Sequence, residues 1–401
     1  MDVPTDSTEI VDTPTPVNQL SELMSDIAGP VVMPGLISGR AGAARELALK
    51  RHGGSRQTED AVIRALKWLK ENQLADGSWQ GKGSANSKTG MTGLALLTFL
   101  AHGETPSSVE YGETVQKAIR FLVEAQQEAG NFRHTEGGER GGVYANGIAT
   151  YALSEAYAMT RIPMLRGPME KGITHIIKGQ REDGGFDYDY AKTGGKRDRC
   201  TSVAGWQSQA LKASLMAGAE VPGLREAARN AAEGLKLNQR DDKKFLYASG
   251  RQSSEIGDRR IMTAIAVLCL QILGEGRSQE AQQGMRAINS ASPEDYHNES
   301  EPVYAWYYAT QAYFHTGGTT WSQWNRRFAP MVVKNQNPDG SWNWPLGRSN
   351  EYGPVYHTTF SALSLMVYYR YLPTMQTDLI APPVAPDQRQ EAPEDGLEFR
   401  I

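Results

Sequence analysis

The sequence is poor in cysteine, with only Cys200 and Cys269 among 401 residues. Two cysteines in apolar surroundings predict no disulfide framework, and they fit a reducing, cytoplasmic compartment. No run of about 18 apolar residues is present, so the sequence predicts no membrane-spanning helix. The apolar stretch over 27–37 is short, is interrupted by Gly and Pro, and follows no basic segment, so we expect no signal peptide.

An excess of positive charge is also lacking. The chain has 42 Lys and Arg against 46 Asp and Glu, for a net charge of -4. Nucleic-acid binding requires a clustered positive field, so we expect no nucleic-acid partner. The hydrophobic fraction of 39% is that of a soluble globular chain. No apolar insertion stands out, so membrane association is unsupported, and the sequence does not indicate an oligomeric state.

A short motif recurs along the chain. It reads QNPDGSW at 336–342 and QLADGSW at 73–79, with weaker copies that begin at Gln127, Gln180 and Gln239. The five Gln residues are 54, 53, 59 and 97 positions apart, and the last interval is about two repeats. A period near 50 residues predicts a repeat architecture, with one copy of the motif lost near 291–294.

The motif has a structural interpretation. Its Gln can hydrogen-bond the backbone of the following turn, and Asp-Gly supplies a tight turn with positive φ. The aromatic residue that ends the motif looks exposed in the sequence, and we expect it to pack over the neighbouring outer helix. The motif therefore predicts contacts that hold successive repeats together.

Two kinds of helix alternate between the motifs. Amphipathic helices that end near the motif Gln are predicted over 61–73, 113–127, 165–180, 224–239, 278–288 and 321–336. Helices apolar on every face, and therefore buried, are predicted over 89–102, 144–159, 201–217, 260–273, 303–315 and 358–371.

Six hairpins of one outer and one inner helix can close into a ring. The sequence therefore predicts an all-α fold, an α/α toroid with inner helices around a central cavity. We assign residues 41–375 to the toroid, with a short helix over 41–51. Residues 1–40 and 376–401 are rich in Pro, Ser, Thr, Gln and acid and are predicted to be disordered.

Gln-x(3–5)-Gly-x-Trp/Phe repeats on such a ring resemble the terpenoid cyclase and protein prenyltransferase superfamily. The resemblance covers roughly residues 58–372 and is nearest to bacterial prenyltransferase/squalene-cyclase-repeat proteins. That nearer likeness rests on the segments 147–157, 201–207, 307–311 and 321–325. It implies an isoprenoid-handling protein with an apolar cavity and, in one form, cyclisation of squalene or another polyprenyl chain.

Aromatic residues at the starts of the inner helices are candidates for the cavity wall. Aromatic faces stabilise carbocations, and a dry apolar cavity suits a prenyl chain. Packing in the core is the alternative role for each of them. The candidate substrate-binding residues are Tyr144, Trp206, Tyr304, Tyr307, Tyr356 and His357, and Trp306, Tyr308 and Phe360 are further candidates for the lining.

A squalene-type cyclase needs a Brønsted acid, which the family supplies from an Asp-x-Asp-Asp-Thr motif. When this motif is aligned on Thr201, Arg199 and Cys200 replace its last two acids, and neither can protonate an alkene. Asp198, one position away, is the candidate catalytic acid, and capping of the next helix is its alternative role. Asp187 and Asp189 form a second acidic pair, for which we expect a solvated loop.

The prenyltransferases bind zinc through an Asp-x-Cys pair and a His in a Tyr-His-Thr setting. The chain has both elements, at 198–200 and 356–358. However, 157 positions separate Cys200 from His357, which places them on opposite inner helices, too far apart for bonds of about 2.0–2.3 Å. We therefore predict no metal site and no cofactor. The non-catalytic alternative is a toroidal binding or scaffold protein, and a zinc-dependent prenyltransferase-like enzyme is the second alternative.

Overall fold

A computed structural model provides the structure. It describes residues 40, 42–83, 87–133, 139–190, 199–249, 260–288, 303–343 and 352–370. This described part contains helices and no strand; only isolated β-bridges occur, two of them across motif turns. The predicted disorder of both chain ends falls outside these residues and stays a prediction.

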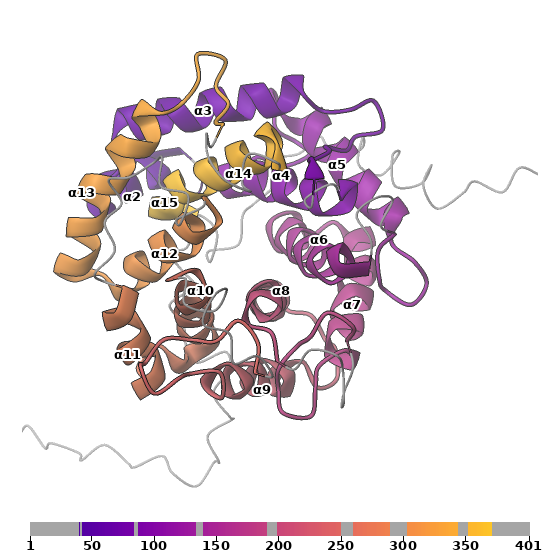
Figure 1. Ribbon diagram of the computed structural model, residues 1–401. Helices are drawn as coiled ribbons and strands as arrows, with labels where there is room; N and C mark the ends of the chain where they lie inside the picture. The colour runs from indigo at the N-terminus through magenta and orange to yellow at the C-terminus, as the bar shows by residue number, and fades with distance from the viewer. Residues whose placement is uncertain are drawn as a thin grey trace, which may run out of the picture.

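Twelve of the helices form two concentric rings (Figure 1). The inner ring consists of α4 (Lys88–His102), α6 (Glu139–Thr160), α8 (Thr201–Ala217), α10 (Arg260–Leu270), α12 (Val303–Thr316) and α14 (Pro354–Leu365). The outer ring consists of α3 (Arg56–Glu71), α5 (Gly112–Ala125), α7 (Pro163–Lys178), α9 (Leu224–Lys236), α11 (Gln279–Ile288) and α13 (Gly318–Lys334). Because α14 packs on α4 and α13 on α3, the ring is closed. The predicted α/α toroid is confirmed.

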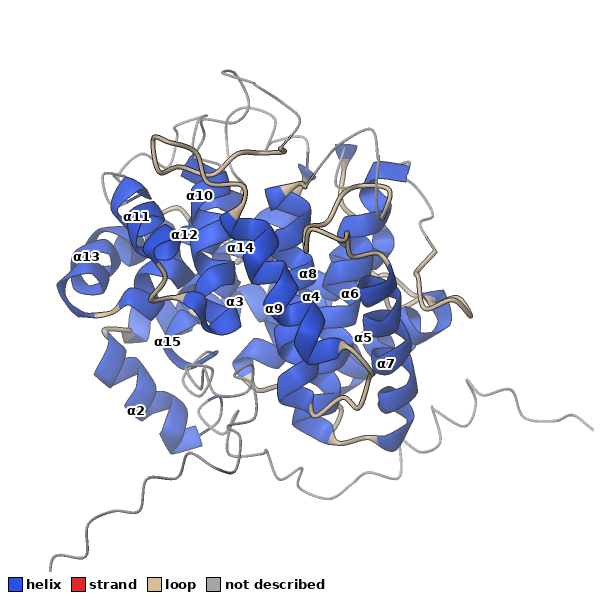
Figure 2. Ribbon diagram, turned by 90° about the horizontal axis from the view of Figure 1, so that it is seen from below, coloured by secondary structure: helices blue, strands red, loops and turns tan. Residues whose placement is uncertain are grey.

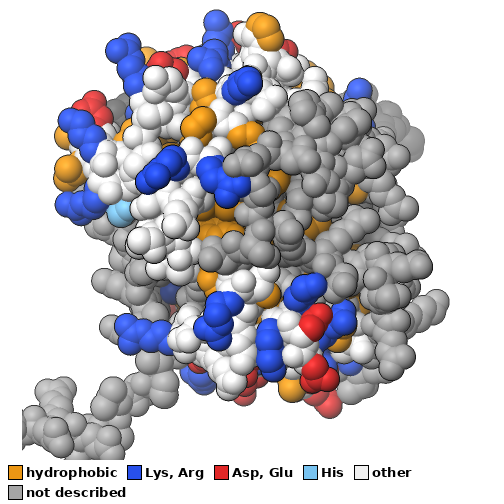
Figure 3. Space-filling view, turned by 60° about the vertical axis from the view of Figure 1, so that its left-hand side comes forward, with side chains coloured by type: hydrophobic (Ala, Val, Ile, Leu, Met, Phe, Trp, Pro, Cys, Tyr) orange, Lys and Arg blue, Asp and Glu red, His pale blue; other side chains and the backbone are white. Residues whose placement is uncertain are grey.

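Side-chain polarity explains which helices lie inside. Every residue from Thr89 to His102 of α4 is buried, as expected of a helix that is apolar or small on all faces. In the outer helix α3, the buried residues form one stripe that includes Val62, Leu66 and Leu69. The opposite faces of the outer helices are polar, and charged side chains are spread over the described part of one side of the molecule (Figure 3).

The motif Gln residues connect each repeat to the next. The side-chain amide nitrogen of each one donates to two carbonyls at 2.8–3.3 Å, one four residues later and one in the next outer helix. Gln336 donates to Gly340 and to Ala61 of α3, so the same contact closes the ring. In the second repeat this residue is Gln126, not the predicted Gln127, because Gln126 stands four residues before the turn glycine Gly130, as Gln73 stands before Gly77.

The turn that follows each Gln needs a residue with positive φ. Gly77, Gly130, Gly184 and Gly340 occupy this position with φ between 81° and 93°. A Cβ on any of them would come within 2.0–2.5 Å of a carbonyl oxygen of the next outer helix, since the turn lies against that helix. The fourth repeat has Lys243 there, also at positive φ (70°).

The aromatic residue that ends the motif is not exposed. Trp79 and Trp342 are both 0% exposed. The indole nitrogen of Trp79 donates to the Leu69 carbonyl of its own outer helix, and that of Trp342 donates to Val332 in the same way. The expectation of packing over the neighbouring outer helix is thus corrected: the indole lies between the two helices of its own hairpin.

Two further helices lie at one end of the toroid. The first is α2 (Gly42–His52), close to the predicted 41–51, and the second is α15 (Val367–Arg370), which packs against it. Figure 2 shows α2 beside the rings, below α13. The Arg40 guanidinium is buried here, 2.7 Å from the Glu155 carboxylate. No helix in the described part of the chain is long and apolar enough to cross a bilayer.

Candidate aromatic cavity

A cavity of about 270 Å³ lies among the first turns of the inner helices. Half of its twelve described lining residues are aromatic: Tyr144, Trp206, Tyr304, Tyr352, Tyr356 and Phe360. Met91, Leu94 and Ile148 add apolar surface, and Gly90 and Ala145 leave room. None of these lining residues is Asp, Glu, Lys, Arg or His. The described wall is therefore suited to an apolar or cationic molecule.

Packed aromatic rings close the cavity towards the middle of the toroid. Trp206 of α8 stacks on Tyr307 of α12, with ring centroids 5.8 Å apart, and lies 6.1 Å from Phe360 of α14. Tyr304 and Tyr308 meet edge to face at 5.0 Å. Because side chains from opposite inner helices touch, the cavity is a pocket at one end of the ring and not a channel through it.

One side of the cavity wall is polar. The Tyr144 hydroxyl lies 2.7 Å from both the Tyr188 hydroxyl and the Ser202 hydroxyl, and Tyr188 in turn hydrogen-bonds Tyr247. Burial, and then the neighbouring Tyr188, raises the pKa of Tyr144 well above its usual 10. Tyr144 is therefore a neutral phenol near pH 7, which can exchange hydrogen bonds with a ligand but is too weak an acid to protonate an alkene.

The predicted substrate-binding residues divide into two groups. Tyr144, Trp206, Tyr304 and Tyr356 line the cavity, whereas Tyr307 lies behind Trp206. The His357 side chain is 1% exposed, next to the Tyr356 ring, and is not part of the lining.

Among the further candidates, Phe360 lines the cavity. Tyr308 is not part of the lining and packs edge to face against Tyr304. Trp306 instead faces outwards, with its ring 5.4 Å from that of Trp324 on α13. Tyr352 was missed because it lies six residues before the predicted helix over 358–371, further out than the candidate Tyr356. Met91, Leu94 and Ile148 were missed because their positions on the helices did not distinguish them from core residues.

Asp198, the candidate acid, lies outside the described residues. The two residues after it are described. Arg199 donates to the Asp183 carboxylate at 2.9 Å and to the Asn238 side chain at 3.2 Å, and Cys200 is buried 3.2 Å from the Ser202 hydroxyl. Arg199 thus holds a motif turn and cannot act as an acid.

Asp187 differs from expectation. It is 0% exposed and pairs with the Arg181 guanidinium at 3.1 Å, so the prediction of a solvated loop is wrong for it. A carboxylate this deeply buried needs a cationic partner, and Arg181 supplies it within the same turn. Asp189, two residues later, is exposed as predicted.

The zinc alternative requires Cys200 and His357 to meet. Cys200 directly precedes α8, and His357 lies on α14. In the ring, α8 packs between α6 and α10, and α14 packs between α12 and α4, so the two residues begin on opposite sides. No group of three or more His, Cys, Asp or Glu side chains in the described ranges is arranged to hold a metal ion.

A family model for the squalene-hopene cyclase C-terminal domain matches residues 41–200, two fifths of the chain. The predicted resemblance to the terpenoid cyclase and prenyltransferase superfamily is confirmed. Among solved structures, the type II terpene cyclase MstE from Scytonema is similar, with a TM-score of 0.54 at 14% identity, covering 80% of this chain and 100% of that one.

Carbohydrate-active proteins share the architecture. Cellobiose 2-epimerase from Spirochaeta thermophila has a TM-score of 0.60 at 15% identity, covering 82% of this chain and 99% of that one. The GH76A α-1,6-mannanase from Salegentibacter has a TM-score of 0.58 at 10% identity, covering 81% and 100%. At these identities the likenesses show the toroid fold alone, and the chemistry has to be argued from the cavity.

Proposed function

We propose that this protein binds an isoprenoid, or a similar apolar molecule, in the aromatic cavity. The observation that carries the proposal is the lining: six aromatic rings with aliphatic side chains between them and no charged residue in the described wall. Aromatic faces are also the groups that stabilise positive charge on a carbon skeleton. The match to the squalene-hopene cyclase domain supports the same ligand class.

The cavity volume limits the size of the ligand. A water-sized group takes roughly 30 Å³, so 270 Å³ holds about nine such groups. This is just below the usual range of ligand pockets, about 300–1,000 Å³. The described cavity therefore fits a unit of about ten carbons, one segment of a polyprenyl chain and not the whole of a triterpene.

The carbohydrate alternative has less support. Glycoside hydrolysis uses a pair of carboxylates that flank the scissile bond. The described cavity wall has none, and the nearby Asp187 is buried in its pair with Arg181. Cyclisation remains part of the proposal through Asp198, which is the acid to test. A zinc-dependent prenyltransferase has no support from the positions of Cys200 and His357.

Binding can be tested with native mass spectrometry after exposure to a bacterial lipid extract, followed by titration with geraniol and farnesol. We expect a retained isoprenoid and saturable quenching of tryptophan fluorescence. Trp206→Phe should remove most of this signal, while Trp306→Phe, an equally buried tryptophan that faces outwards, should keep it. Ala145→Leu fills the cavity and should weaken binding at least about tenfold, a change of about 1.4 kcal/mol.

A bare polypeptide mass, together with no saturable quenching by either alcohol, would refute the proposal and favour the scaffold alternative. If ligand binding is found, Asp198→Asn separates the remaining possibilities. If Asp198→Asn abolishes turnover of a polyprenyl substrate, Asp198 is assigned as the catalytic acid. If the variant leaves turnover unchanged, Asp198 is excluded from that role. Circular dichroism of each variant checks that the helical fold is intact.

A further inference from the structure

A second and larger concavity lies at the other end of the toroid. It encloses about 1040 Å³ between the end of α2, the last turn of α12 and the first turns of α13. Tyr304 of the aromatic cavity and Phe314 of this groove are ten residues apart on α12, so roughly 15 Å separates the two sites. The groove is therefore distinct from the cavity proposed for the isoprenoid.

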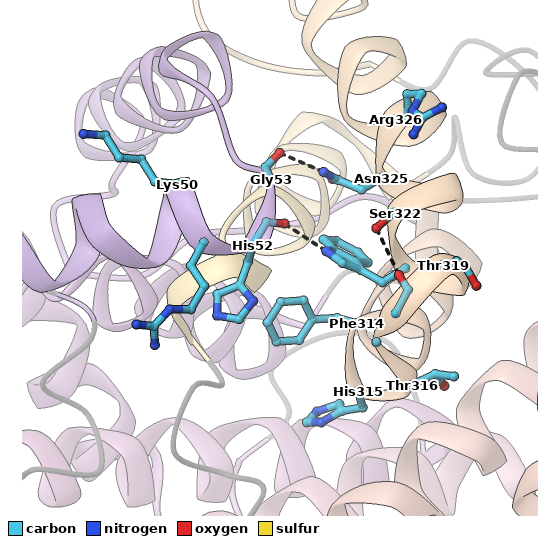
Figure 4. Close-up of a pocket in the computed structure, with 14 residues that line it drawn as sticks. Lys50, His52, Gly53, Phe314, His315, Thr316, Thr319, Ser322, Asn325 and Arg326 are labelled. Carbon is cyan, nitrogen blue, oxygen red and sulfur yellow. Dashed lines mark hydrogen bonds between the residues drawn. The ribbon is translucent and has the colours of Figure 1, made fainter.

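The side chains of the groove are strongly biased in charge. Five of its fourteen lining residues are Lys, Arg or His, and none is Asp or Glu, although Asp and Glu outnumber Lys and Arg in the chain as a whole by 46 to 42. The five are Lys50, Arg51, His52, His315 and Arg326. Figure 4 shows His52 beside Phe314 with His315 below them, while Lys50 and Arg326 extend outwards on either side.

Two carbonyl groups at the end of α2 accept hydrogen bonds from side chains of α13. The Trp321 indole donates to the His52 carbonyl at 2.9 Å, and the Asn325 amide donates to the Gly53 carbonyl at 2.8 Å. These two contacts fix the end of α2 against α13. They hold the backbone of the Arg51–His52 segment in place beside the groove.

Further donors lie on the opposite wall. Helix α13 starts at Gly318 after the N-cap Gly317, which gives its first turn no side-chain cap. A Cβ on Gly317 or Gly318 would meet nothing within 4 Å, so the approach to this turn is open. The first-turn N–H groups and the Thr319 hydroxyl add neutral donors to the basic side chains.

The pKa values of the two groove histidines are lowered by burial and by a nearby cation. Burial, and then the adjacent Arg51, lowers the pKa of His52. Burial, and then Lys212 of α8, lowers the pKa of His315 to about 4. The His52 imidazole thus lies near the Arg51 guanidinium, whose charge a bound anion would offset.

We propose that this groove binds a phosphate group, with Arg51, His52 and His315 in contact with it and Thr319 as a neutral donor. Lys50 and Arg326 form an outer rim that attracts the anion. A phosphate suits the groove because it accepts several hydrogen bonds and its negative charge would offset that of Arg51. The phosphate could come from a soluble molecule or from a lipid head group.

Isothermal titration of the full chain with inorganic phosphate, at constant ionic strength set with chloride, tests the proposal. We expect saturable binding that Arg51→Gln with His52→Gln weakens at least about tenfold. Both side chains can be changed without loss of the α2–α13 contacts, which use backbone carbonyls. Lys171→Gln, an exposed lysine on α7, is the matched control and should leave the affinity unchanged.

Two further measurements complete the test. In NMR titrations, bound phosphate should raise the pKa of His52 and His315, since an anion favours the protonated form. Co-sedimentation with phosphatidylglycerol vesicles, compared with phosphatidylcholine vesicles, distinguishes the sources. Vesicle binding that depends on Arg51, without binding of free phosphate, supports the proposal and assigns a lipid head group. Equal phosphate affinity for the double variant and wild type, or no binding in either assay, would overturn it.

Discussion

The closure of the ring depends on a glycine turn, which Gly340→Ala should disrupt. Gly340 has a φ of 93°, and a Cβ there would come within 2.4 Å of the Arg64 carbonyl oxygen on α3. The left-handed backbone costs Ala about 1–2 kcal/mol, and relief of the contact requires α13 and α3 to separate. Forced overpacking of this kind costs about 1–3 kcal/mol. We therefore expect Gly340→Ala to lower the free energy of unfolding by about 3 kcal/mol.

The fourth repeat supplies the control. Lys243 occupies the same position of the motif, also at positive φ, so the turn there already accommodates a Cβ. Lys243→Ala should therefore change the free energy of unfolding by less than about 0.5 kcal/mol. Urea denaturation followed by circular dichroism measures both. If Gly340→Ala is as mild as Lys243→Ala, the close approach of the turn to α3 does not constrain the residue, and the reasoning is refuted.

Three other changes test different parts of the structure. Gln180→Leu removes both hydrogen bonds from the motif amide to Gly184 and Ala227, and should lower the free energy of unfolding by about 2 kcal/mol in urea; no loss would show that the motif Gln does not join the repeats. Burial opposes a charged His102, but its hydrogen bonds to Glu104 and Glu59 raise its pKa above 6.5 and lower theirs below 4.5. The contribution of protonated His102 to stability is lost as pH rises through the pKa of His102 in the folded state. The contribution of the two carboxylates to stability is lost as pH falls through their folded-state pKa values. The stability difference between wild type and His102→Gln should therefore be largest at about pH 4.5–6.5 and shrink on both sides, whereas a pH-independent difference would exclude the ion pairs. Tyr144→Phe should weaken binding of geraniol more than binding of myrcene, a hydrocarbon of the same ten carbons, because only the alcohol can hydrogen-bond the phenol, and equal effects in fluorescence titrations would show that Tyr144 contributes only its ring.

Local pattern predicted most of the helices. The expected inner helix over 201–217 coincides with α8, and the expected helix over 89–102 differs from α4 by one residue. The inner helices were recognisable because their small and apolar residues cover every face. Small errors arose where neighbouring residues were equivalent in type, as with Gln126 and Gln127 in the second motif.

The direction in which each side chain of an inner helix points, towards the cavity or towards the outer ring, was harder to predict. Trp306 and Tyr307 are adjacent aromatic residues on α12, yet one packs against α13 and the other behind Trp206. A helix apolar on every face gives no signal of which side meets the cavity. Asp187 also resembled a loop acid, because nothing in the sequence shows that its turn is buried.

The sequence by itself determined the repeat, the alternation of helix types and therefore the toroid, because each is a property of residues within about 50 positions of one another. Only the tertiary structure decided that rings from α8, α12 and α14 meet across the centre and reduce the cavity to about 270 Å³. The same holds for the basic groove, where α2 lies against residues more than 260 positions away. Such contacts depend on the packing of the closed ring, which no local pattern encodes.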